Sequence, residues 1–222
     1  MERYISAIGF SPNLVTRPII ANGVSSGDTI QIIRPEQNTE NAETRVSNAI
    51  ENVQSTLNGA VNSVDIEVHT ISNLDFSAVV EQCSEIIVDG EPPVVCLGAG
   101  ATDIHIPLTV AATAHQHQIK STMMYSDLEA TANNIDIPAL TSRLPGRARD
   151  TFRLVAEADA ETGISLAELA DTQEKARSTV GRHIQSLEKH GFVRTTRKEK
   201  SKQAFVTSLG RITYRGMRDA SV

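Results

Sequence analysis

The sequence predicts an α/β fold in which a Rossmann-like, mostly parallel sheet is followed by a winged helix-turn-helix domain. Three observations predict it. Short apolar runs alternate with helical patterns in the first part of the chain. A short helix, a tight turn, a longer helix and a basic hairpin follow in the second part, and the net charge changes sign between the two parts. We expect the Rossmann-like domain over residues 1–137, a linker with two prolines and a glycine over 138–147, and the winged helix-turn-helix domain over 148–222.

Strands and helices are expected to alternate through the N-terminal domain. The predicted strands cover 4–8, 29–35, 65–71, 94–97 and 121–125, with one more over 135–137. The predicted helices cover 14–23, 40–57, 76–88 and 102–114. Because a crossover between parallel strands of one sheet is almost always right-handed, this order predicts a largely parallel sheet with helices on both faces.

Two loops that contain glycine follow predicted strands, at Gly9–Asn13 and Gly98–Asp103. In such sheets, ligands bind beyond the carboxyl ends of the strands, at the point where the strand order reverses. Small residues let a ligand approach backbone N–H groups, and helix starts favour an anion, so we expect a phosphate-bearing small molecule. The alternative is that these glycines only allow tight turns. A dinucleotide dehydrogenase is not expected, because Asp103 stands where the third glycine of GxGxxG would lie.

The segment from Ser165 to Gly191 predicts the helix-turn-helix. Ser165 and Glu168 form the capping-box pattern of a short helix, and Gly191 supplies the stop signal of a longer one. The longer helix carries an apolar stripe at helical spacing, which is expected to face the core: Ala176, Val180, Ile184 and Leu187.

The other face of the longer helix is polar and basic, and the hairpin after it has a tip rich in Lys and Arg. DNA binding needs this division, because phosphate contacts supply affinity while a helix in the major groove reads base edges. Lys175 is expected on the outward face. The residues expected in the groove are Ser178, Thr179 and Arg182, and those expected at phosphates are Arg177, Arg194, Arg197, Lys198, Lys200 and Lys202. The alternative is a set of solvated surface charges, but the ordered series of elements favours DNA.

The distribution of charge agrees with this interpretation. Residues 1–143 hold 6 Lys and Arg against 17 Asp and Glu, a net charge of −11, and residues 144–222 hold 15 against 10, a net charge of +5, which together give −6. An acidic body with a basic end is expected where only the end meets DNA.

Other classes of protein are not indicated. No apolar run is long enough to span a bilayer and no signal peptide is recognised, so we expect a cytoplasmic protein that binds no membrane. Cys83 and Cys96 lie in apolar surroundings and are expected to be buried and reduced. No metal-ligand spacing and no catalytic Ser/His/Asp set is found, and His115 and His117 are interpreted as solvated residues at a helix end.

Four stretches in order carry a resemblance to a known family: GFSPNLVTRPI, GDTIQIIRP, VVCLGAGATDIHIPLTVAA and STVGRHIQSLEKHGFV. Over nearly its whole length the chain resembles the archaeal CRISPR-associated regulators of the Csa type. These join an N-terminal CARF domain, which senses a ligand, to a C-terminal winged helix that binds double-stranded DNA.

The resemblance implies a homodimer whose CARF halves form one pocket for a cyclic oligoadenylate, usually the tetramer, as effector rather than cofactor. It implies a first ligand loop of Gly9, Phe10, Ser11, Pro12 and Asn13, and a second of Gly98, Ala99, Gly100, Ala101 and Thr102. Many members continue the second loop with Lys or Arg, whereas this chain has Asp103, Ile104 and His105. We expect a regulator without catalytic residues. The alternative is a ring nuclease that opens the cyclic oligoadenylate, with Ser11, Thr102 and His105 as candidates.

Overall fold

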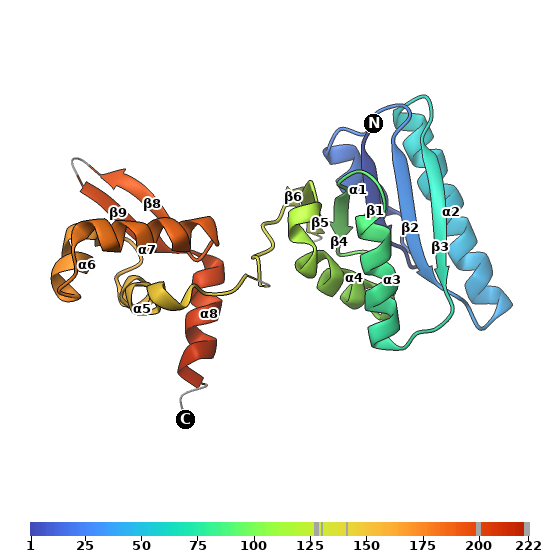
Figure 1. Cartoon of the computed structure of the whole chain (residues 1–222). Helices are drawn as coiled ribbons and strands as arrows, with labels where there is room; N and C mark the ends of the chain where they lie inside the picture. The colour runs from blue at the N-terminus through green and yellow to red at the C-terminus, as the bar shows by residue number, and fades with distance from the viewer. Residues whose placement is uncertain (127–128, 130, 141, 199–200, 220–222) are drawn as a thin grey trace. The chain divides into compact units, whose positions relative to one another are not determined.

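The computed structural model describes residues 1–126, 129, 131–140, 142–198 and 201–219, and for Lys198, Arg218 and Asp219 it describes the backbone only. The chain divides into two compact units, Met1–Ile137 and Pro138–Val222 (Figure 1). Among the described residues, no helix combines the length and the apolar composition that crossing a membrane requires.

The N-terminal unit is built on a six-stranded sheet of order β3-β2-β1-β4-β5-β6. Its strands are β1 (Arg3–Ala7), β2 (Thr29–Pro35), β3 (Asp65–Ile71), β4 (Val94–Leu97), β5 (Ser121–Ser126) and β6 (Thr131–Asn134). The pairs among β1 to β5 are parallel, as expected, and β6 is antiparallel to β5. The strand expected over 135–137 is wrong, because the strand ends at Asn134 and only the Ile135 N–H still donates to the carbonyl of Thr122, at 2.8 Å.

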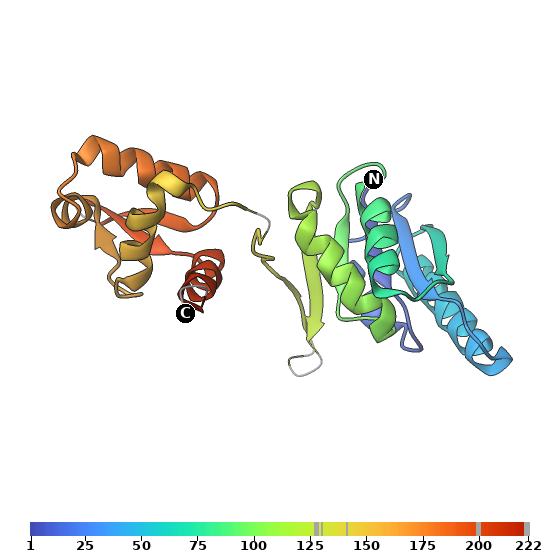
Figure 2. The same cartoon turned by 60° about the horizontal axis from the view of Figure 1, so that its bottom comes forward.

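Helices cover both faces of this sheet (Figures 1 and 2). They are α1 (Asn13–Ala21), α2 (Glu40–Ala60), α3 (Phe76–Val88) and α4 (Thr102–Ala114), followed by the short η1 (Gln116–Gln118). Side chains of α1 and α2 pack with one side of the strands, where Tyr4, Ile30 and Ile32 lie. Side chains of α3 and α4 pack with the other side, where Ile5, Ile33 and Val95 lie. The alternation of apolar residues along each strand therefore fills two separate cores.

Both cysteines belong to these cores. Cys83 on α3 and Cys96 on β4 are buried and free, as the sequence predicts. Burial raises the pKa of the Cys83 thiol to about 11 and that of the Cys96 thiol to about 12. Because the thiolate is the reactive form, both cysteines are structural at neutral pH.

In the C-terminal unit, the described residues form five helical segments and a three-stranded antiparallel sheet of order β7-β9-β8. The elements are η2 (Gly146–Ala148), α5 (Arg149–Glu157), β7 (Ile164–Ser165), α6 (Leu166–Thr172), α7 (Arg177–Lys189), β8 (Val193–Lys198), β9 (Ser201–Val206) and α8 (Ser208–Asp219). This is the winged helix-turn-helix order that the sequence predicts, with β8 and β9 as the wing.

A single core holds the C-terminal unit together. Phe152 of α5 meets Phe192 edge to face with 5.7 Å between ring centroids, and buried residues of α6, α7 and α8 surround this pair. Ala139 and Leu144, from the segment expected to be a linker, pack against the same core. Part of that segment therefore belongs structurally to the C-terminal unit.

Two glycines of α8 give a matched test of this packing. A Cβ atom on Gly210 would lie 2.2 Å from the carbonyl oxygen of Phe192, whereas one on Gly216 would meet no atom within 4 Å. We expect Gly210→Ala to destabilise the C-terminal unit by about 1–3 kcal/mol through overpacking, and Gly216→Ala to stabilise it by up to about 1 kcal/mol through helix propensity. Amide hydrogen exchange of α7 in the full chain measures both. Equal exchange rates in the two variants would contradict the packing described for Gly210.

Candidate functional site

The helix-turn-helix is formed by α6, a turn and α7. Ser165 caps α6 through its side chain, which accepts from the Glu168 N–H, while the Glu168 carboxylate accepts from the Ser165 N–H at 2.8 Å. In the turn, Glu174 has a positive φ of 50° and the Lys175 N–H donates to the carbonyl of Ala170. The longer helix therefore begins at Arg177, later than its sequence pattern suggests, and Ala176 precedes it as the N-cap.

One side of α7 is buried and the other is open to solvent. Val180, Ile184 and Leu187 are fully buried in the core of the C-terminal unit. The predicted groove residues Ser178 and Arg182 are exposed, Thr179 is partly exposed, and Arg177 is exposed at the start of the helix. The apolar stripe thus holds α7 so that its polar residues face outward.

Lys175 differs from the other predicted DNA contacts. It precedes α7, is partly buried, and its ammonium donates to the side-chain oxygen of Gln173 at 3.1 Å. The same oxygen accepts from the hydroxyl of Thr151 at 3.0 Å, and that hydroxyl lies 2.9 Å from Nδ1 of His183. Burial lowers the pKa of His183, and the charges of Lys175 and Arg182 act in the same direction. This network connects α5, the turn and α7.

The wing is joined to α7 through Glu188. Its carboxylate accepts from the backbone N–H of Thr195 at 2.9 Å and from the Thr195 hydroxyl at 2.5 Å, and lies 3.7 Å from the ammonium of Lys202. The Thr195 hydroxyl lowers the pKa of the Glu188 carboxyl, against the opposing effect of its partial burial. The position of the wing beside α7 is therefore set by a charged hydrogen-bonded group.

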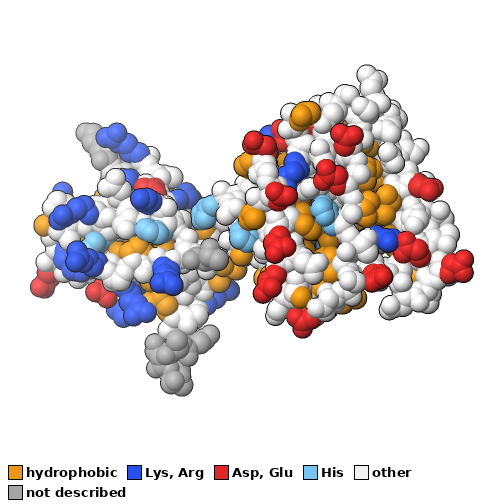
Figure 3. Space-filling model, turned by 45° about the vertical axis from the view of Figure 1, so that its right-hand side comes forward, with side chains coloured by type: hydrophobic (Ala, Val, Ile, Leu, Met, Phe, Trp, Pro, Cys, Tyr) orange, Lys and Arg blue, Asp and Glu red, His pale blue; other side chains and the backbone are white. Residues whose placement is uncertain are grey.

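The predicted phosphate contacts of the wing differ in their surroundings. The guanidinium of Arg194 stacks on the ring of Phe205, 4.6 Å from its centroid, which fixes its direction. Arg197 is exposed, and Lys202 lies beside Glu188. Lys200 and the side chain of Lys198 lie outside the described residues. Figure 3 shows Lys and Arg gathered on the visible face of the C-terminal unit, and Asp and Glu spread over that of the N-terminal unit.

In the N-terminal unit, the two glycine loops leave neighbouring strands at the point where the strand order reverses, between β1 and β4. A Cβ atom on Gly9 would lie 3.4 Å from the carbonyl carbon of Gly100, so the two loops are in contact. Gly100 has φ +98°, and a Cβ atom there would lie 2.5 Å from that of Ala7. Both the conformation and the close approach exclude a larger residue at this position.

A crevice of about 420 Å³ opens beside these loops. Among the predicted ligand residues, those that line it are Gly9, Phe10, Gly100 and Ala101. Those that flank it without lining it are Ser11, Pro12, Asn13, Gly98, Ala99 and Thr102. The sequence interpretation missed the contribution of the loop between β2 and α2, namely Glu36, Gln37, Asn38 and Thr39. That loop follows the strand next to β1, so only the strand order places it here.

The charges around the crevice are mixed. Glu36 and Asp103 line it, and the guanidinium of Arg45 lies 3.8 Å from the centroid of the half-exposed Phe10 ring. Nδ1 of His105 accepts from the backbone N–H of Gly98 at 3.4 Å. That contact gives His105 a structural role in the second loop. Among the described residues there is no group of three or more His, Cys, Asp and Glu side chains that could hold a metal ion.

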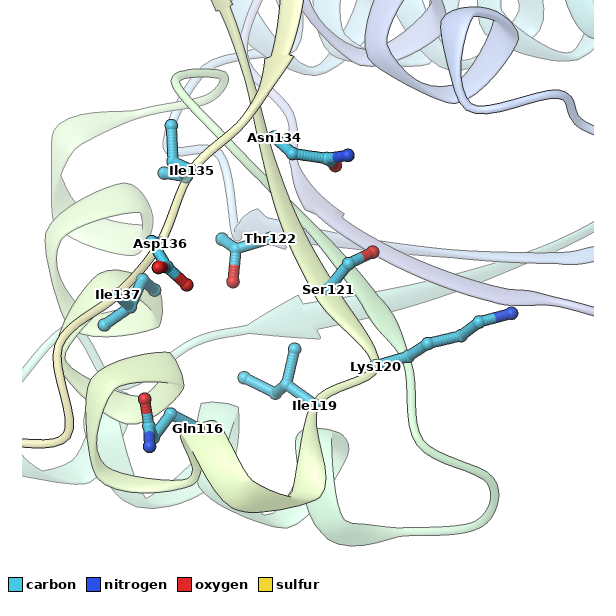
Figure 4. A pocket seen from close by; sticks show the side chains of 9 residues that line it. All are labelled: Gln116, Ile119, Lys120, Ser121, Thr122, Asn134, Ile135, Asp136 and Ile137. Carbon is cyan, nitrogen blue, oxygen red and sulfur yellow. The ribbon is translucent and has the colours of Figure 1, made fainter. Parts of the chain in front are cut away.

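A second hollow, of about 500 Å³, lies at the amino end of β5, which is the opposite edge of the sheet. Figure 4 shows Gln116, Thr122 and Asp136 around it, with the side chain of Lys120 pointing away. The ammonium of Lys120 pairs with Glu2. This hollow is therefore separate from the glycine loops.

Comparisons with solved structures find partial similarities. A MarR transcriptional regulator from Methanosarcina mazei Go1 is 24% identical, with 36% of this chain and 58% of that chain covered and a TM-score of 0.33. The transcriptional regulator SlyA is 24% identical, with 34% and 53% covered and a TM-score of 0.30. HlyU from Vibrio cholerae N16961 is 15% identical, with 36% and 85% covered and a TM-score of 0.31. The chain thus spans little more than half the length of the first two. No curated protein sequence matches.

Comparisons with protein families assign both units. Residues 147–197 match the IclR helix-turn-helix domain. Residues 2–138 match the Csa3 CRISPR-associated Rossmann-like domain, which is more than half of the chain. The chain thus joins a Rossmann-like domain of this kind to a helix-turn-helix domain. The chain therefore belongs to the family defined by the Csa3 CRISPR-associated Rossmann-like domain.

Proposed function

We propose that the protein is a homodimeric regulator of CRISPR-associated genes, which binds duplex DNA through α7 and the wing and responds to a cyclic oligoadenylate or a similar nucleotide. The observation that carries the DNA part is the exposed polar face of α7, held outward by the buried Val180, Ile184 and Leu187. In a dimer, two such helices related by a dyad fit half-sites about 34 Å apart or a multiple of that distance. The expected operator is therefore palindromic.

Within this interface, Ser178 and Arg182 are the proposed base-reading residues, and Arg197 is a proposed phosphate contact. Replacing Ser178 and Arg182 together by Ala and Gln should lower the preference for the operator over unrelated duplex by about tenfold to hundredfold, because base-edge contacts carry the discrimination. Arg197→Gln should weaken binding to both duplexes alike. Fluorescence anisotropy with the two duplexes at one salt concentration measures this. An unchanged preference in the double variant would refute the assignment of α7.

The outer face of α4 supports a dimer through the N-terminal unit. Ile106 is 47% exposed and Val110 is 42% exposed, one turn apart on the helix that begins in the second glycine loop. Two apolar side chains at this spacing form a stripe that a second copy of α4 would cover. Because α4 starts beside the crevice, pairing there would bring two crevices together around one ligand.

A charged residue in this stripe tests the dimer. We expect Val110→Glu to convert the dimer to a monomer, because the interface would then bury an unpaired carboxylate. Val88→Glu is the matched control, since Val88 ends α3 and is 44% exposed outside the stripe. Sedimentation velocity measures both variants. A dimer that persists in Val110→Glu at the same concentration would place the interface elsewhere.

The crevice offers features that suit a nucleotide. The open ring of Phe10 provides a stacking surface, Arg45 above it provides a positive charge, and the loops of Gly9 and Gly100 allow close approach of phosphate to the backbone. Asp103 opposes a phosphate because the two carry like charges. The ligand is proposed to be bound and not cleaved, since His105, the candidate acid or base, does not line the crevice.

The negative charge of Asp103 predicts the direction in which its removal changes ligand affinity. We expect Asp103→Asn to bind cyclic tetra-adenylate about fivefold more tightly than the wild type, because one repulsive charge is removed. Asp136→Asn, an exposed carboxylate at the opposite edge of the sheet, should leave affinity unchanged. Isothermal titration calorimetry measures the affinities, and radiolabelled ligand recovered intact excludes turnover. Weaker binding in Asp103→Asn, or linear product from the wild type, would contradict the proposed sensor.

A further inference from the structure

A pocket of about 460 Å³ lies in the C-terminal unit, along one flank of α7. On one side it is lined by the segment Pro145–Ala148, which leads through η2 into α5. On the other side it is lined by α7 residues Thr179, Arg182, His183 and Ser186. The sequence pattern placed Pro145, Gly146 and Arg147 in the linker. It therefore predicted neither this pocket nor a role for Arg147.

The lining of this pocket is basic and has no carboxylate. Arg147 and Arg182 are both exposed, and within the described part of the chain neither guanidinium has a hydrogen bond or an ion pair. Thr179 and Ser186 add hydroxyl groups to the lining. The unpaired guanidinium of Arg147 and the hydroxyl donors suit an oxyanion, while Arg182 borders the hollow from the face of α7 that is proposed to read bases.

The imidazole of His183, on α7, also lines the pocket. Its Nδ1 lies 2.9 Å from the hydroxyl of Thr151, and the charge of Asp150 raises its pKa against the larger lowering effects of burial, Lys175 and Arg182. Asp150 lies in the first turn of α5 and does not line the pocket. No acidic side chain therefore faces the guanidinium groups of Arg147 and Arg182 from within the lining of the hollow.

The location of the pocket indicates which oxyanion it takes. A recognition helix in the major groove has a sugar-phosphate strand along its flank, and the pocket opens on the flank of α7 that carries Thr179 and Ser186. We infer that the pocket binds one backbone phosphate of the duplex, with Arg147 as a phosphate ligand outside the helix-turn-helix. This inference rests on the proposed DNA binding and extends the contact to the segment before α5.

Salt-dependent binding of duplex by the full chain tests the inference. Arg147→Gln should weaken binding about tenfold for operator and unrelated duplex alike, because charge-assisted hydrogen bonds to phosphate are lost, and should reduce the slope of log affinity against log salt by about one. Arg153→Gln is the matched control, since Arg153 lies on α5 with its guanidinium 3.7 Å from Glu157, away from the pocket. It should leave the slope unchanged. Thermal melting of both variants checks that the exposed substitutions leave folding intact.

Four other outcomes would count against the inference or against the proposed function. A slope in Arg147→Gln equal to that of the wild type would overturn the inference, as would an equal reduction in Arg153→Gln. Titration of inorganic phosphate, followed by amide chemical shifts of Ala148 and His183, separates the sources of the ligand. Phosphate-dependent shifts that vanish in Arg147→Gln while duplex binding is unchanged would assign the pocket to a free phosphate compound and overturn the DNA assignment. A wild-type chain that binds no duplex at low salt would refute the proposed function itself.

Discussion

The burial of one apolar stripe of α7 is the constraint on which the proposed DNA-binding surface depends. Val180, Ile184 and Leu187 are fully buried against α5, α6 and the start of β8. Each of these side chains contributes about 1.5–3 kcal/mol relative to an exposed position, so rotation of the helix about its axis is strongly opposed. The direction of Ser178 and Arg182 follows from this packing. Glu188 then places the wing on the same helix through Thr195.

The N-terminal unit depends on a different constraint, the close approach of two backbones at the strand-order reversal. Gly100 packs against Ala7 so tightly that a single added carbon would clash. The second loop is thereby held against the end of β1, and the crevice forms between these loops and the residues that follow β2. Its charge is mixed, with Arg45 on the ring of Phe10 and Asp103 in the wall, so the proposed anionic ligand would meet both an attractive and a repulsive group.

Much of the fold could be predicted because local patterns determine it. The capping box at Ser165 and the stripe of α7 predict their helices, since caps and helical periodicity are properties of neighbouring residues. The positions of Gly98 and Gly100 likewise predict a loop with positive φ, which the structure has. The strand at Thr131–Asn134 was misplaced because three of its four residues are polar, so its pairing with β5 leaves little apolar signal in the sequence. The sequence did not predict that Glu36 to Thr39 line the crevice or that Arg147 lines the pocket. Only strand order and helix packing bring these residues there. The contacts assigned to individual residues stay predictions.

The central claim is that α7 and the wing form the surface that meets duplex DNA, while the acidic N-terminal unit does not. Amide hydrogen exchange of the full chain with and without duplex at low salt tests it most directly. The account predicts slower exchange in the N-terminal half of α7, in β8 and β9 and at Ala148, with no change along α2 and β3. Slower exchange confined to residues 1–137, or none in α7, would contradict it.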